Sequence, residues 1–82
     1  MKNTSPSTFG EWLKTTRRAY DLTQQELAHK VGCAEITIRK IEANRLRPSK
    51  QLSAVLLETL QVPRSEQSEL MALARRNHHV GE

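Results

Sequence analysis

The sequence predicts an all-α domain of five helices, and three features of the 82-residue chain support this fold class. Apolar residues recur every three or four positions, which is the period of an amphipathic helix rather than of a strand. Threonine or serine, which cap helix N-termini, stands at the start of three of the periodic segments. Glycine, asparagine, aspartate or proline separates the segments, as expected where helices end.

Composition limits the class of protein. Hydrophobic residues make up 37% of the chain and Phe, Trp and Tyr occur once each, so the core must consist mainly of Leu, Ile, Val and Ala. The chain is close to the smallest size at which a domain folds without disulfides or metals. Its net charge of +4 favours a polyanionic partner. A single cysteine excludes an internal disulfide and is typical of the reducing cytoplasm, where we expect the protein. No apolar run is long enough for a bilayer, so we expect no membrane association.

The first predicted helix begins at Thr8, after an N-terminal arm, residues 1–7, that we expect to be disordered. Thr8 and Glu11 have the spacing of a capping box, in which each side chain bonds to the other residue's backbone N–H. The apolar face consists of Phe9, Trp12, Leu13 and Thr16, and the cations along the helix are Lys14, Arg17 and Arg18. Asp21 follows, and aspartate tolerates the left-handed conformation that ends a helix better than most residues do.

Thr23 and Glu26 repeat the capping-box spacing at the start of the second predicted helix. Gly32 follows its last apolar residue and favours a left-handed helix end. We expect Cys33, in the turn, to be a small buried residue rather than a redox sensor. The apolar stripe consists of Leu27, Ala28 and Val31. A third periodic segment begins directly afterwards, so the sequence predicts a helix-turn-helix.

The third predicted helix has two different faces. Its inner stripe consists of Ala34, Ile38 and Ile41. Its outer face consists of Glu35, Ile36, Arg39, Lys40 and Ala43. Such an outer face can read base edges in the major groove, because Arg and Lys donate to guanine, Glu accepts from cytosine and Ile contacts the thymine methyl group. The alternative is that Ile36 is one of the scattered apolar side chains that every protein surface carries.

The segment after the third helix contains Asn44, a residue type that often ends a helix in the left-handed conformation. Two cations, Arg45 and Arg47, are placed to contact a phosphate strand. Ser49 can cap a fourth helix. The apolar stripe of that helix consists of Leu52, Val55, Leu56, Thr59 and Leu60, and Gln61, Val62 and Pro63 end it. The fifth helix has Leu70, Leu73 and Ala74 on its apolar side and ends with Arg75 and Arg76.

Several motifs occur in the order of a known family. They are Leu22 to Ala28, Val31 and Gly32, Thr37 to Glu42, and Arg47 to Ser49. On these residues, the chain from residue 9 to about residue 60 resembles the helix-turn-helix domains of the XRE family, the lambda-repressor and Cro type. Residues 62–75 are similar to the fifth helix of XRE domains that precede NTPase or repeat domains in large bacterial regulators. The chain departs from the family where Ala34 replaces a capping Ser or Thr, and where Asp21 and Asn44 replace Gly.

The resemblance implies a lambda-repressor-like fold that binds double-stranded DNA and regulates transcription, with the third helix in the major groove. It also implies a partly buried structural ion pair between Arg17 and Glu42. We predict base reading by Glu35, Ile36, Arg39 and Lys40. We predict phosphate contacts by Gln24, Thr37, Asn44, Arg45 and Arg47.

Specific recognition usually requires two half-sites, so a homodimer through the exposed side of the fifth helix, with Leu70 or Met71, is one expectation. The alternative is that this helix closes the core over Trp12 in a monomer. The rival function is a protein-interaction module, antitoxin-like or an adaptor arm of a larger regulator. Such a module would keep the helix-turn-helix scaffold and bind DNA weakly or not at all.

The sequence predicts neither catalysis nor a cofactor. Ser, Cys and His form no nucleophile and base arrangement, and the chain is too small to enclose a substrate, so we expect no enzyme and no small-molecule substrate. His78 and His79 have no cluster of Cys or carboxylate near them, so we assign no metal and place them in a disordered tail, residues 77–82. The helix-turn-helix domain is expected to span residues 8–76. The resemblance is also compatible with a natural protein that continues beyond Glu82.

Overall fold

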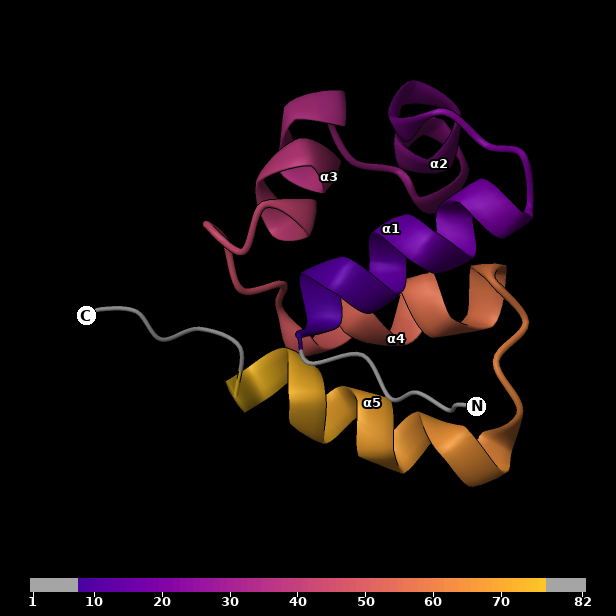
Figure 1. The fold of residues 1–82 in the computed structure, drawn as a ribbon, viewed down its shortest axis with the longest axis vertical. Coiled ribbons are helices and arrows are strands. Elements are labelled where there is room, and N and C mark those ends of the chain that lie inside the picture. Colours follow the sequence, from indigo (N-terminus) through magenta and orange to yellow (C-terminus); the bar gives the residue numbers. More distant parts are fainter. Residues whose placement is uncertain (1–7, 77–82) are drawn as a thin grey trace.

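The computed structural model describes residues 8–76, which fold into five α-helices without a strand (Figure 1). This confirms the predicted fold class. The expected arm and tail, including His78 and His79, lie outside the described residues. The helices are α1 (Phe9–Ala19), α2 (Gln24–Val31), α3 (Glu35–Glu42), α4 (Lys50–Thr59) and α5 (Arg64–Arg76).

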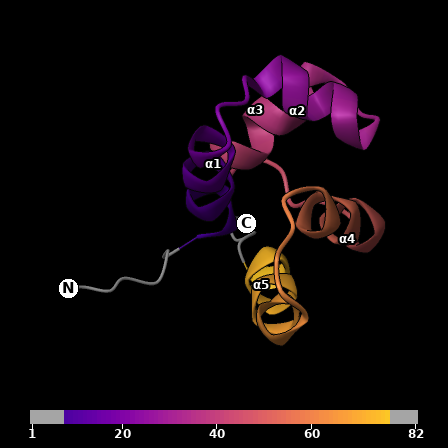
Figure 2. The same ribbon diagram turned by 90° about the vertical axis from the view of Figure 1, so that its right-hand side faces the viewer.

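Helix α1 crosses the middle of the molecule, with α2 and α3 on one side and α4 and α5 on the other (Figure 1). A view from the side shows α2 and α3 together above the other helices (Figure 2). Helix α1 packs against α3 and α5, and α4 packs against α2 and α5. No described helix has the length and apolar character needed to cross a membrane. The core between the helices contains the large buried side chains Phe9, Leu13, Leu27, Ile38, Ile41, Leu56 and Leu57.

Hydroxyl caps begin three of the helices, as the sequence predicts. The side chains of Thr8, Thr23 and Ser49 each accept a hydrogen bond at 3.0 Å from the backbone N–H three residues later. At Thr23 the capping box is complete, because the carboxylate of Glu26 accepts from the Thr23 N–H at 2.8 Å. Ala34 precedes α3 without a side-chain cap. Helix α3 is therefore held in place by its packing rather than by a cap.

Helices α1 to α4 end in the same way, with one left-handed residue. The next residue's N–H then donates to the carbonyl five positions earlier, which is the closing bond of a Schellman motif. The left-handed residues are Asp21, Gly32, Asn44 and Gln61, with φ of 57°, 77°, 61° and 58°. The donors are Leu22, Cys33, Arg45 and Val62, at N···O distances of 2.8 to 3.1 Å. Gln61 was not foreseen in this conformation. Val62 packs against the core, and this tertiary contact accompanies the turn.

Two residues predicted to be internal are exposed. Ala34 belongs to no buried stripe, because it lies before the first turn of α3. Val55 is 37% exposed, whereas Ser53 and Leu57 on the same helix are buried. The reason is that α4 packs between α2 and α5. Its buried face therefore consists of Ser53 and of the residues three and four positions later, Leu56 and Leu57.

Gly10 allows α1 to approach the end of α3. A Cβ atom at this position would lie 2.8 Å from the carbonyl oxygen of Glu42 and closer still to that of Ile41. It would also lie 2.5 Å from the side-chain oxygen of Asn44. The sequence pattern did not identify this glycine, because the close approach involves residues about 30 positions away along the chain. Gly10 thus sets the distance between α1 and the helix-turn-helix.

Candidate nucleic-acid interface

Helices α2 and α3 pack against each other through a turn centred on Gly32. Leu27 and Ala28 of α2 and Ile38 and Ile41 of α3 are buried in the same core. The turn is closed by the bond from the Cys33 N–H to a carbonyl of α2. With its inner side chains buried in this way, α3 presents one long side to the surface.

The outward side of α3 is accessible, as the sequence predicts. Ile36 is 45% exposed, and Arg39 and Lys40 are exposed. Glu35 is half-buried, and its carboxylate accepts a hydrogen bond from Nη2 of Arg39 at 3.2 Å, one helical turn away. We call these four residues the reading face. Since the side chains of Arg39 and Glu35 are 56% and 42% exposed to solvent, this ion pair is weak and can exchange for other partners.

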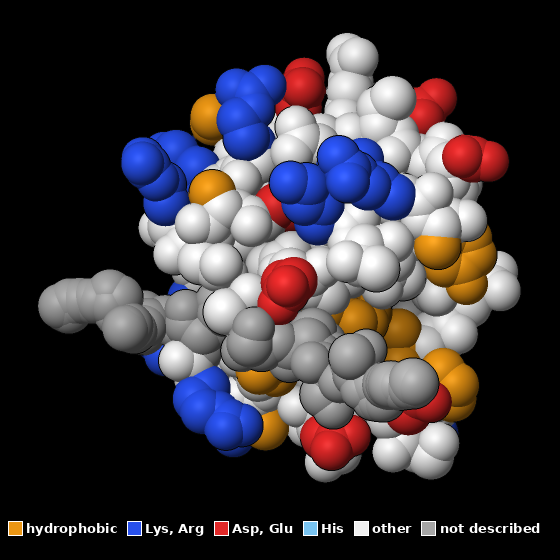
Figure 3. Space-filling view, in the orientation of Figure 1, with side chains coloured by type: hydrophobic (Ala, Val, Ile, Leu, Met, Phe, Trp, Pro, Cys, Tyr) orange, Lys and Arg blue, Asp and Glu red, His pale blue; other side chains and the backbone are white. Residues whose placement is uncertain are grey.

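Further cations are exposed on α1 and in the loop that follows α3. Lys and Arg side chains gather over α3 and the adjacent part of α1 on the side of the molecule shown in Figure 3. Lys14 and Arg18 of α1 are exposed, as is Arg45 in the loop after α3. Asn44 turns this loop back through its left-handed backbone. A polyanion that contacts α3 would therefore meet positive charge on its flanks as well.

Beneath α3, a network of buried polar groups fixes the helix to the rest of the domain. Nε of Arg17 donates to Oε2 of Glu42 at 2.6 Å, and Nη2 donates to Oε1 at 3.1 Å. Nη1 of Arg17 also donates to the carbonyl of Leu22 at 2.7 Å. The amide of Gln24 donates to the same carboxylate at 3.0 Å. Three helices are thus joined at the C-terminal end of α3.

The surroundings of Arg17 favour its charged form. The hydrogen bonds that Arg17 donates to Glu42 raise the pKa of the guanidinium above its ordinary value, against an opposing effect of burial. The side chains of Arg17 and Glu42 are only 10% and 4% exposed. A charge buried to this extent needs its partner, because loss of one member leaves the other desolvated and unpaired. This pair therefore holds α3 in its orientation.

Two residues predicted to contact phosphate are engaged within the protein. The side-chain amide of Gln24 is bonded to Glu42, so the N-terminal end of α2 offers its backbone N–H groups rather than this side chain. Arg47 donates through Nη1 to the carbonyl of Arg75 at 3.2 Å, and this bond links the loop after α3 to the end of α5. Thr37 is half-buried, whereas Asn44 and Arg45 are exposed.

Helix α5 packs part of its apolar side into the core. Leu70, expected as a contact for a second copy, is only 9% exposed, and Met71 is half-buried against the core. Leu70 faces inward because α5 packs against both α1 and α4. Trp12 of α1 is also partly buried against this core, with its ring centroid 5.1 Å from that of Phe9.

Cys33 lies in the turn between α2 and α3 and is partly buried against the core. Burial raises the pKa of its thiol. The thiolate, which is the reactive form, is disfavoured in this position. Its partial burial therefore supports a packing role for Cys33 in the turn.

The fold and the solvent-facing side of α3, the second helix of the motif, define a helix-turn-helix domain. Comparison with known families matches residues 13–67 to the helix-turn-helix family HTH_3, and the chain belongs to this XRE-type family. Its members are DNA-binding regulatory domains and are typically not enzymes. No curated protein and no solved structure matched the chain.

Proposed function

We propose that the protein is a cytoplasmic transcription regulator that binds double-stranded DNA sequence-specifically, with α3 in the major groove. The observation that supports this most strongly is the contrast between the two sides of α3. Its inner side is anchored by buried apolar residues and by Glu42, whereas the reading face is exposed. A rigidly held helix with a free polar side is what major-groove reading requires.

Each residue of the reading face has a complementary base edge. Arg39 and Lys40 can donate to O6 and N7 of guanine, and Glu35 can accept from the amino group of cytosine. Ile36 can contact the methyl group of thymine. In the free protein Glu35 holds Arg39, so Glu35 also restricts the orientations that Arg39 can adopt before it meets DNA.

Contacts with the phosphate backbone come from residues around α3. Arg45 and Asn44 lie in the loop that follows α3. Thr37 lies within α3, and the N-terminal end of α2 lies beside α3. Gln24 reaches a phosphate only by giving up its bond to Glu42, and Arg47 only by giving up its bond to Arg75. Each phosphate neutralised by a cation should add about −0.9 to the slope of log affinity against log salt concentration.

Selection of bound duplexes from a random pool tests the proposal directly. We expect an enriched motif. Two copies of the protein on one palindrome would give two half-sites about 34 Å apart, so the symmetry of the motif also reports on dimer formation. If no sequence is enriched above background, the protein would instead fit an interaction module that uses Ile36 and Glu35 against a protein partner.

A matched pair of variants then assigns the role of Lys40. Lys40→Ala should reduce affinity for the selected duplex and relax the preference at one base pair, by about 1–3 kcal/mol. Arg64→Ala removes the same charge from the far end of α5, where the side chain is exposed, and should leave base preference unchanged. Affinity for variant duplexes measured by fluorescence anisotropy distinguishes the two. An equal loss of affinity on every sequence would make Lys40 a backbone contact.

A further inference from the structure

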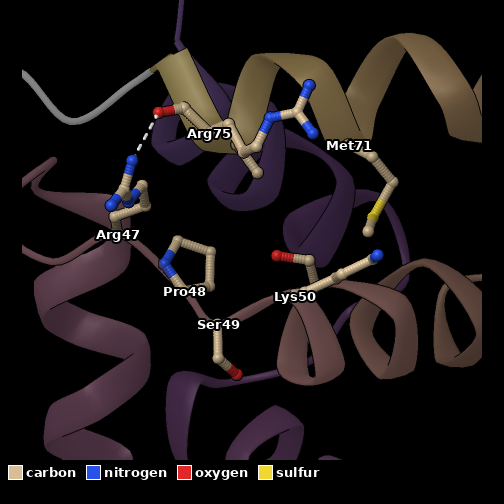
Figure 4. Close-up of a pocket in the computed structure, with 8 residues that line it drawn as sticks. Arg47, Pro48, Ser49, Lys50, Met71 and Arg75 are labelled. Atoms are coloured by element: carbon tan, nitrogen blue, oxygen red, sulfur yellow. Dashed lines mark hydrogen bonds between the residues drawn. The ribbon is translucent and has the colours of Figure 1, made fainter.

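A cavity of about 610 Å³ lies between the N-terminal end of α4 and the C-terminal half of α5, and we call it the α4–α5 cavity (Figure 4). Three cations line it, Arg47, Lys50 and Arg75, and no Asp or Glu is among the described residues around it. Lys50 and Arg75 lie on opposite sides of the opening, one on each helix (Figure 4). Arg47 donates to the Arg75 carbonyl, which uses one of its five N–H groups. The cavity is therefore strongly positive.

Ser53 provides an independent sign of a ligand. This residue lines the cavity and is only 2% exposed. Its hydroxyl forms no hydrogen bond with any other residue in the range 8–76. Buried polar side chains in proteins nearly always have a hydrogen-bond partner, so an unpaired hydroxyl at the wall of a cavity indicates a polar group that enters the cavity.

The start of α4 adds donors to the same place. The Ser49 hydroxyl caps the N–H of Leu52, but the N–H groups of Lys50 and Gln51 belong to the first turn and have no partner within the helix. No acidic residue lies in this first turn to neutralise the positive end of the helix. A helix N-terminus of this kind favours an anion.

The size of the cavity and its apolar wall narrow the class of ligand. Its volume falls within the range of about 300–1,000 Å³ that is usual for small-molecule sites and is too large for an inorganic ion alone. Pro48, Met71 and Ala74 supply apolar surface beside the cations. We propose that the α4–α5 cavity binds a small organic phosphate monoester. The phosphate bonds to Lys50, Arg75 and Ser53, and the organic part lies on Met71. This site goes beyond the proposed function and does not depend on DNA binding.

The test is a titration of the full 82-residue protein with phenyl phosphate at constant ionic strength, followed by proton–nitrogen NMR. The expected result is a change in the chemical shifts of the Lys50, Gln51 and Ser53 amides that saturates as phenyl phosphate is added. Inorganic phosphate should bind the same amides more weakly, since it lacks the apolar part. Absence of saturating changes at these amides overturns the proposal, and equal affinity for the two probes overturns the role of Met71.

Variants separate this site from a general attraction to positive charge. Lys50→Gln should weaken phenyl phosphate binding about tenfold, as expected for a charge-assisted hydrogen bond. Ser53→Ala keeps the buried position small and should weaken binding severalfold. Lys14→Gln removes the same charge from an exposed position on α1 and should leave the affinity unchanged. An equal effect of Lys50→Gln and Lys14→Gln would show binding by net charge alone and would contradict the proposal.

Discussion

Helix α3 contains two glutamates that each pair with an arginine, and the two pairs differ in burial. Glu42 pairs with Arg17 beneath the helix, where the side chains are 4% and 10% exposed. Glu35 pairs with Arg39 on the reading face, where the side chains are 42% and 56% exposed. The carboxylate of Glu42 accepts bonds from both Arg17 and Gln24, whereas Glu35 accepts a single bond from Arg39, at 3.2 Å.

This difference shows how one chemical pairing serves two purposes. The buried pair cannot separate without leaving a charge in a poorly solvated place, so it fixes the position of α3. The exposed pair competes with water and salt, so each member can leave its partner for DNA at little cost. One side of the helix is therefore held and the other is available.

The largest effect is expected from breaking the buried pair. Glu42→Ala leaves the Arg17 guanidinium buried without its carboxylate and should lower the free energy of unfolding by about 3–5 kcal/mol. Urea denaturation followed by circular dichroism measures this change. The double variant Arg17→Met with Glu42→Ala should lose less than the sum of the two single variants, because no charge stays buried. Additive losses would mean that the two side chains do not act as a pair.

Gly10→Ala tests the close approach that brings α1 against the end of α3. The new methyl group would collide with the backbone carbonyls of Ile41 and Glu42 and should lower the free energy of unfolding by about 1–3 kcal/mol. The sign of the change in the free energy of unfolding is informative, because alanine in place of glycine would otherwise stabilise a helix by about 1 kcal/mol. Thr15→Ala, at an exposed position of the same helix, should change stability by less than about 0.5 kcal/mol. A more stable Gly10→Ala variant would contradict the tight contact.

Ala34→Ser should have the opposite effect, at the end of α3 that lacks a cap. A serine hydroxyl at this position can accept a bond from the backbone N–H of Ile36, since that of Thr37 already donates to the Ala34 carbonyl at 3.0 Å, and it should stabilise the domain by about 1 kcal/mol. Thermal unfolding measures the gain. Ala54→Ser, at an exposed position inside α4, provides no cap and should not stabilise. The same change in both variants would rule out capping as the cause.

The smallest effect is expected at the exposed pair. Glu35→Ala should alter the free energy of unfolding by no more than about 0.5 kcal/mol, because an exposed pair one helical turn apart contributes little. The measurement is urea denaturation under the conditions used for Glu42→Ala. A loss comparable to that of Glu42→Ala would remove the distinction between the two sides of α3.

The parts of the fold that depend on neighbouring residues were predictable from the sequence. The caps at Thr8, Thr23 and Ser49 and the left-handed positions of Asp21, Gly32 and Asn44 all follow from short-range chemistry. The inner and outer residues of α3 followed from helical periodicity, except that Ala34 and Ala43 flank the helix instead of lying within it. The contact between Arg17 and Glu42 came from the family resemblance and is present in the structure.

The features that depend on packing between distant segments were not predictable. Val55 fits a helical stripe by spacing, but only the positions of α2 and α5 decide that Ser53 and Leu57 are buried instead. The bonds of Gln24 to Glu42 and of Arg47 to Arg75 join residues 18 and 28 positions apart. A cation or amide in a loop looks the same in the sequence whether it meets a phosphate or its own fold. The base-reading and phosphate-contacting residues therefore remain predictions.

The central claim is that α3 is held on one side and reads DNA with the other, and one NMR experiment tests both halves. The labelled protein is titrated with its selected duplex, and the amides of α3 are followed together with the Arg17 Nε–H signal of the buried pair. We expect the largest chemical-shift changes at the amides of Glu35, Ile36, Arg39 and Lys40. The Arg17 signal should stay sharp and unshifted. Chemical-shift changes only at amides outside the reading face would contradict the account. Loss of the Arg17 signal on binding would also contradict it.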